Sequence, residues 1–215
     1  GTYAQYTGFK NRIINGAMVI DQRNAGASVT PTTGAWYYTV DRWAFWVSQA
    51  SKLTAQQVSD APTGFKNSLK VTSSSAYAIN STDIFSIVQY IEGNNFADLS
   101  YGSSSAQTMT ISFWVKSSLT GTFGGALQNS AGNRGYAFTY TISAANTWEY
   151  KTVTITGDVT GTWLTTNGIG IGVIWGLGVG STNSVAAGSW GAYTYPNSAT
   201  GATSVVAVSG ATWQI

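Results

Sequence analysis

Apolar and polar residues alternate along most of the chain with a period of two, which is typical of β-strands rather than helices. Strands are expected at residues 39–48, 67–73, 85–91, 108–118, 136–142, 149–155, 168–180 and 210–215, with a weaker candidate at 52–59. Clusters of Gly, Asn, Asp and Ser separate these runs, about one per 10–15 residues. The pattern predicts an all-β protein with a jelly-roll β-sandwich fold.

The rest of the chain offers little regular structure. Residues 94–102 are expected to form at most one helical turn, and the glycine-rich stretches 119–125 and 129–135 are interpreted as turns. The sandwich is assigned to residues 19–215. Residues 1–18 are assigned to an N-terminal arm or linker that runs from a preceding segment or onto a neighbouring subunit.

The expected strand at 168–180 carries large apolar side chains on one face and mostly glycine on the other. A strand with a bare face allows another backbone, a subunit or a ligand to approach closely. We favour close packing inside the sandwich, and the alternative is a contact between subunits.

Composition excludes several function classes. The chain has no Cys and no His, so disulfides, His-based triads, Cys nucleophiles and His or Cys zinc sites are ruled out. Ten basic residues are scattered and the net charge is only +2, which argues against binding to nucleic acid. No run approaches the ~18 apolar residues of a membrane span, so membrane insertion is not expected.

The eight carboxylates give weak evidence for chemistry. Glu92 and Glu149 are the nearest to a glycosidase-like pair by type, but partnership with Lys or Arg is the favoured interpretation. Asp41 is expected to face the core with Arg23 or Arg12 as its partner. We therefore expect no enzyme activity, no catalytic residues, no cofactor and no metal site.

Aromatic residues are the better candidates for a binding site, because sugar rings lie flat on them through apolar C–H faces. Two loops are rich in aromatics, and exposed loops at the end of a β scaffold are common ligand surfaces. The alternative is that these rings pack on the ends of the sandwich or against a second subunit. The candidate ligand-binding residues are Trp36, Tyr37, Tyr38, Trp190, Tyr193 and Tyr195.

Other aromatics are assigned to structure. Trp43, Phe113 and Trp175 occupy apolar positions of strands and are expected in the core. Trp148 precedes a strand and is expected to fold over the end of the sandwich. Tyr150 is expected to point outward.

Residues 67–158 resemble carbohydrate-binding jelly rolls with a galactose-binding-like fold. The similarity is carried by "SLKVTSSS", "QYIEG", "TISFWVKSSLTGTF" and "NTWEYKTVTITGD", in that order. The resemblance implies a β-sandwich, and it says little about the ligand.

The motifs "KNRIINGAMVIDQRNAG" and "YTVDRWAFW", together with "FWVKSSLTGTFGG", resemble a module of tailed-phage virion proteins. This resemblance implies a non-enzymatic structural protein on the outside of the virion, on tail or capsid, often a homotrimer in contact with other virion proteins. It favours a tail-fibre or receptor-binding domain that contacts host surface polysaccharide. The alternatives are a capsid decoration or head-fibre protein, and a carbohydrate-binding module of a polysaccharide-degrading enzyme.

Overall fold

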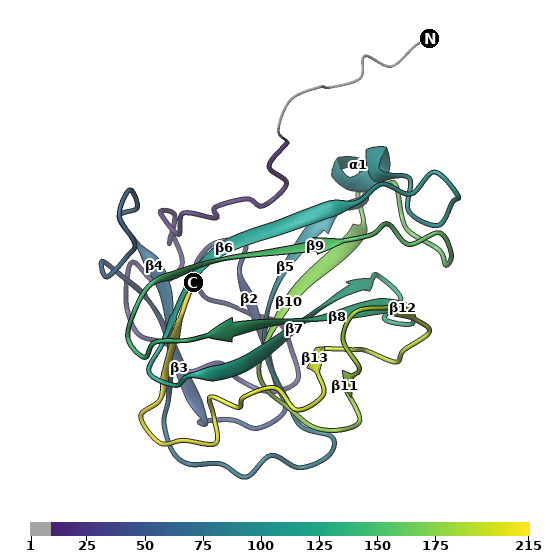
Figure 1. Cartoon of the computed structure of the whole chain (residues 1–215). Coiled ribbons are helices and arrows are strands. Elements are labelled where there is room, and N and C mark those ends of the chain that lie inside the picture. The colour runs from purple at the N-terminus through teal and green to yellow at the C-terminus, as the bar shows by residue number, and fades with distance from the viewer. Residues whose placement is uncertain (1–9) are drawn as a thin grey trace.

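The computed structural model describes residues 10–215, and these residues form two β-sheets packed face to face (Figure 1). One sheet has seven strands in the order β1-β2-β5-β10-β7-β8-β12, and the other has five in the order β3-β4-β14-β6-β9. A small parallel pair, β11 and β13, is hydrogen-bonded to neither sheet as a ladder, and β13 packs against β7 and β10 of the larger sheet. The predicted all-β jelly-roll sandwich is confirmed.

The elements follow the chain in this order: β1 (Tyr37–Tyr38), β2 (Ala44–Val47), β3 (Leu53–Val58), β4 (Ser68–Ser73), β5 (Ile84–Glu92), α1 (Gly93–Phe96), a 3-10 turn (Ala97–Leu99), β6 (Met109–Ser117), β7 (Gly121–Asn129), β8 (Gly135–Ile142), β9 (Glu149–Ile155), β10 (Ile169–Val179), β11 (Ser184–Val185), β12 (Trp190–Gly191), β13 (Ser198–Ala199) and β14 (Thr212–Gln214). None of the helices among residues 10–215 is long and apolar enough to cross a membrane.

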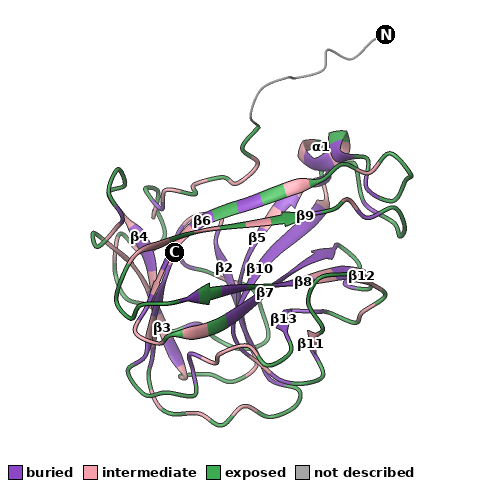
Figure 2. Cartoon of the chain, viewed as in Figure 1, coloured by how far each residue is buried: buried purple, intermediate pink, exposed green. Residues whose placement is uncertain are grey.

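The core lies between the two sheets, where alternate side chains of each strand meet. Figure 2 shows β5 and β10 buried along most of their length, whereas β6 has buried residues between more exposed ones and β9 has mostly intermediate and exposed residues in turn. Trp175 is central to this core, because its ring contacts Trp43 at 5.4 Å and Phe113 at 5.6 Å between centroids. The three rings are buried, as the strand pattern predicted.

The N-terminal segment lies against the sandwich from residue 10 onward, and residues 1–9 of the predicted arm lie outside the described residues. Met18 is buried, and the backbone of Ile14 exchanges two hydrogen bonds with the side chain of Gln89 on β5. This segment therefore forms part of the wall of the sandwich in the described structure.

Two expectations about the strands were wrong. Residues 121–129 form β7, a central strand, although its glycines suggested turns. The expected strand at 39–48 is ordered as a strand only at β2, since Asp41 and Arg42 form a turn in which Arg42 has a φ of 74°. That turn explains why Asp41 has no arginine partner: its carboxylate accepts from the backbone of Gln22 at 3.4 Å.

The glycine face of β10 is covered by the chain itself. A side chain at Gly176 would meet Ser198 at 2.7 Å, and one at Gly178 would meet Val206 at 2.6 Å. The segment that contains β13 therefore lies almost flat on the outer face of the seven-stranded sheet. Close packing inside the fold, the favoured interpretation of this strand, is confirmed.

Gly176→Ala should destabilise the protein by about 1–3 kcal/mol, because the added methyl group would overpack this contact. Gly168→Ala is the matched control, since its Cβ would lie 3.4 Å from Leu164 in ordinary contact. Urea unfolding of both variants measures the difference. Equal stability of the two variants would show that the glycine face isn't tightly packed.

Candidate functional site

The two predicted aromatic loops lie at opposite edges of the seven-stranded sheet. Tyr37 and Tyr38 form β1 at one edge, and Trp190 begins β12 at the other. Six steps between strands separate them, and at about 4.8 Å per step this is about 29 Å along the sheet. The six candidate residues therefore do not form one surface.

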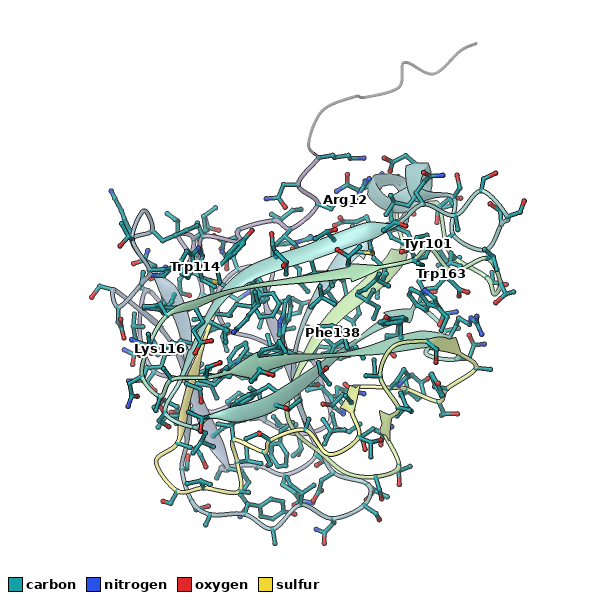
Figure 3. The ribbon with its side chains drawn as sticks, in the orientation of Figure 1. Arg12, Tyr101, Trp114, Lys116, Phe138 and Trp163 are labelled. Atoms are coloured by element: carbon teal, nitrogen blue, oxygen red, sulfur yellow. The ribbon has the colours of Figure 1, made fainter. Side chains whose placement is uncertain are left out.

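Trp190 belongs to an aromatic cluster at its edge of the sandwich. Its ring meets Tyr101 and Trp163 edge-on at 5.6 and 5.4 Å, and its indole N–H donates to the carbonyl of Thr156 at 2.7 Å. Figure 3 shows Tyr101 and Trp163 side by side at the right-hand end of the molecule. Half-buried and hydrogen-bonded, Trp190 closes this end of the sandwich.

The other two aromatics of that loop pack against glycines. Tyr193 lies on Gly191, and Tyr195 lies on Gly132, where a Cβ would come within 2.2 Å of the tyrosine ring. Tyr195 nevertheless leaves 55% of its surface exposed. Its ring is the part of this loop most accessible to a partner.

An open pocket of about 310 Å³ lies at the β1 edge, and we call it the aromatic pocket. Its volume is at the lower end of the range of small-molecule sites. Trp36 and Tyr38 line it as predicted candidates, whereas Tyr37 packs against the core instead. The complete lining is Trp36, Tyr38, Arg42, Tyr90, Glu92, Asn167, Gly168 and Ile169.

The aromatic wall of this pocket is held in place by rings beneath it. Trp36 packs on Trp46 of β2 at 5.0 Å and meets Tyr90 of β5 edge-on at 5.3 Å. The side chain of Arg23 lies over the ring of Tyr38 at 5.4 Å. Trp36 and Tyr38 keep 37% and 39% of their surfaces exposed, so supported aromatic faces remain open to solvent.

A paired guanidinium and carboxylate form the polar wall. Arg42 donates to Glu92 at 2.6 Å and to the carbonyl of Tyr90 at 3.2 Å. The hydrogen bond from Arg42 lowers the pKa of Glu92, which therefore stays ionised at neutral pH. Burial raises the pKa of the Tyr90 phenol, with a smaller contribution from Tyr38, so that hydroxyl stays protonated.

The backbone of Arg42 is strained. A φ of 74° in a non-glycine residue costs on the order of 1–3 kcal/mol, and such residues cluster at functional sites. The strained turn after β1 places the guanidinium beside the aromatic wall. What the pocket can offer is therefore an apolar ring surface next to fixed donors and acceptors.

The remaining carboxylates that the sequence singled out are occupied by basic partners. Glu149 pairs with Lys151 at 2.5 Å and accepts from two backbone N–H groups, whereas Glu92 lies on the other sheet with Arg42. The interpretation of these two residues as partners of Lys and Arg is confirmed.

Asp158 and Asp60 are also paired with basic side chains. Asp158 holds Arg134 through two hydrogen bonds of 2.6 and 2.7 Å, and Asp60 pairs with Lys116. The indole N–H of Trp148 donates to Asp60 at 3.4 Å, and Lys116 lies over the Trp148 ring at 5.1 Å. Among residues 10–215, three or more metal-ligating side chains do not come together.

Sequence reasoning missed half of the aromatic pocket. Tyr90 is hidden in a strand that is apolar at nearly every position, and Asn167 lies in an undistinguished loop. Arg42 was treated as a strand residue. The signal that could have found Arg42 is the aromatic cluster four to six residues upstream, at Trp36 to Tyr38.

No family model matches the chain, and no curated protein matches it. Among solved structures it is similar to the enzymatically active domain of tailspike protein 4 from bacteriophage CBA120. The TM-score is 0.46 and the identity is 12%, with 81% of this chain and 18% of that chain covered. This chain therefore spans less than a fifth of that protein.

The expectation of a non-enzymatic protein is corrected here, because that neighbour is described as enzymatically active. At this level of similarity its activity is a property of the tailspike and isn't assigned to this chain.

The ion pair of Arg42 and Glu92 predicts a small pH effect. Because the pKa of Glu92 is lowered in the folded state, its stabilisation is complete above the usual pKa of about 4.3 and is lost as the pH falls through the lowered value. Glu92→Gln should therefore reduce the free energy of unfolding by about 0.2–1 kcal/mol at pH 7, as for other exposed pairs.

Urea unfolding of wild type and Glu92→Gln at pH 7 and pH 3 tests this effect. The difference between the two proteins should become smaller at pH 3, since protonation of Glu92 weakens the ion pair and the other carboxylates are common to both. A difference that is the same at both pH values would contradict a role for ionised Glu92.

Proposed function

We propose that this chain is a glycan-binding adhesion domain of a tailed-phage virion protein, on the tail, and that the aromatic pocket is its binding site. The observation that carries the proposal is the pairing of supported, exposed aromatic faces with a fixed guanidinium and carboxylate. A pyranose ring can lie on Trp36 or Tyr38 through its C–H face, while its hydroxyls donate to Glu92 and accept from Arg42.

The charge state of the pocket favours a neutral sugar. Arg42 and Glu92 compensate one another, and Asn167 adds an uncharged amide at the rim. A vicinal diol offers one donor and one acceptor to such a pair, and it needs no net charge. An acidic sugar would have to compete with Glu92 for the same guanidinium.

The phage assignment comes from the sequence resemblance, and the fold agrees with it. A homotrimer, contacts with other virion proteins and an exterior position on the virion belong to the same proposal. Shallow sites of this size bind single sugars weakly, and three copies on one fibre would raise the avidity without new contacts. Host surface polysaccharide, a repeating polymer, is the ligand that such an arrangement suits.

Trp36→Ala should weaken binding to a host surface polysaccharide at least tenfold, which is about 1.4 kcal/mol, because it removes the stacking surface. The measurement is calorimetry of the purified domain with polysaccharide fragments. Tyr195→Ala is the matched control, since it removes an exposed ring from the other predicted loop. Loss of binding in Tyr195→Ala alone would move the site to that loop.

Arg42→Gly separates the site from the stability of the fold. Glycine adopts the φ of this position without strain, so the variant should unfold within about 1 kcal/mol of wild type despite the lost ion pair. Its polysaccharide binding should nevertheless fall at least tenfold, because the donor to the sugar is gone. Unchanged binding at unchanged stability would exclude Arg42 from the site.

A further inference from the structure

A second and larger hollow lies on the other side of the sandwich, and we call it the edge groove. Its volume is about 710 Å³. The N-terminal segment forms one wall and β6 the other, and Trp43 and Trp175 lie at its floor. Figure 1 shows the N-terminal segment running beside β6 and β4 at this point. None of the residues that line the groove is charged.

On the side that faces the groove, most of the β6 backbone has no strand partner among residues 10–215. β14 pairs with β6 only at Lys116 and Ser117, whereas β9 pairs with β6 from Met109 to Val115. The N–H of Ser118 donates to Thr212, so even-numbered residues of β6 turn their backbone groups towards β14. The N–H and C=O groups of Thr110, Ser112 and Trp114 therefore face the groove without a strand partner among the described residues.

The direction of β14 leads into the groove. Ile215 exchanges two backbone hydrogen bonds with Leu69 of β4, at 2.9 and 3.1 Å, and it lines the groove. A strand placed in line with β14 would lie between Asn67 and the open edge of β6. In such a strand, the side chains that continue the alternation of Trp213 and Ile215 would point into the sandwich. They would contact Phe113 and Trp175.

The floor of the groove contains an unpaired hydrogen-bond donor, and its rim exposes large apolar side chains. The indole N–H of Trp175 is buried and has no hydrogen-bond partner, whereas that of Trp43 donates to Asn15 at 3.1 Å. Buried donors without partners are rare in folded proteins. Four large apolar side chains at the rim are exposed between 45% and 57%: Val19, Ile20, Phe65 and Tyr150. Clustered exposure of this kind marks a contact surface.

We propose that the edge groove receives an uncharged, extended segment of a partner polypeptide, which adds to β6 in line with β14. Strand addition uses the open N–H and C=O groups for affinity and the hollow beneath them for alternate side chains. A partner strand with apolar residues at every second position would cover Phe113 and Trp175. The uncharged lining disfavours a charged segment, since nothing in the groove would compensate a buried charge.

A tethered strand tests whether the groove accepts such a segment. The full chain is extended after Ile215 by the probe Thr-Val-Thr-Val-Thr-Val, and the control carries Gly-Ser-Gly-Ser-Gly-Ser. Amide hydrogen exchange at Ser112 and Trp114 is measured by NMR in both. Exchange should slow at least tenfold with the Thr-Val probe and stay unchanged with the Gly-Ser control. Equal exchange in the two extended chains would overturn the proposal.

Proline variants identify the edge that is used. Ser112→Pro removes an open donor of β6, whereas Thr152→Pro removes an outward donor from the far edge of β9, because Ser112 and Thr152 are directly opposed. The free Thr-Val hexapeptide should protect Trp114 from exchange in Thr152→Pro and not in Ser112→Pro. Protection in both variants would place the peptide elsewhere and overturn the proposal.

Sedimentation without peptide covers the case of a second copy. If the wild-type chain self-associates through this edge, Ser112→Pro will dissociate it and Thr152→Pro will not, and the proposal of a separate partner fails. The expected result is the same association state for both proline variants.

Discussion

Strand β10 is the element on which the rest of the structure depends, because its two faces meet different demands. Its large side chains, above all Trp175, fill the space between the sheets, and its glycines leave the other face flat. Only a flat face admits the side chain of Ser198 at 2.7 Å, and the carbonyl of Asn197 at 3.2 Å, from where a Cβ would lie at Gly176. The seven-stranded sheet is therefore buried on both faces around β10, which fixes β5 and β7 on either side of it.

Both hollows take their positions from this arrangement. β5 pairs with β10 along nearly its whole length, and so Tyr90 is held against Gly172 on the outer face of the sheet, while Glu92 is held opposite Ile169. The ring of Tyr90 in turn supports Trp36. On the core face of β10, Trp175 is the floor of the edge groove. The aromatic pocket and the edge groove are thus separate surfaces that share one rigid strand, and a ligand in one leaves the other accessible.

Alternation along the chain predicted the fold class and the core because burial between two sheets imposes a period of two on the sequence. The alternation pattern gave wrong predictions where close packing or a turn, rather than burial between the sheets, determined the residue type. β7 contains Gly124 and Gly125, and these pack against Ser198 and Phe138, so glycine there reflects close packing rather than a turn. Strand order cannot be read from the local pattern, and for this reason the sequence did not reveal that Trp36 and Trp190 lie near opposite edges of one sheet. Arg42 reaches the pocket from a turn in which its φ is 74°, and the alternation of apolar and polar residues does not predict such an angle.

The scarcity of charge explains which kinds of contact this domain can make. Six of the eight carboxylates are held by basic side chains or, for Asp83, by Ser48, Tyr77 and Asn80, and their pKa values are lowered. Few free charges remain for recognition, so specificity has to come from shape, ring faces and hydrogen bonds to neutral groups. Both proposed sites work without free charges. The aromatic pocket holds an ion pair whose charges compensate one another, and the edge groove offers open backbone N–H and C=O groups. They call for different partners, since a sugar offers hydroxyls around a ring whereas a strand offers a ladder of amides.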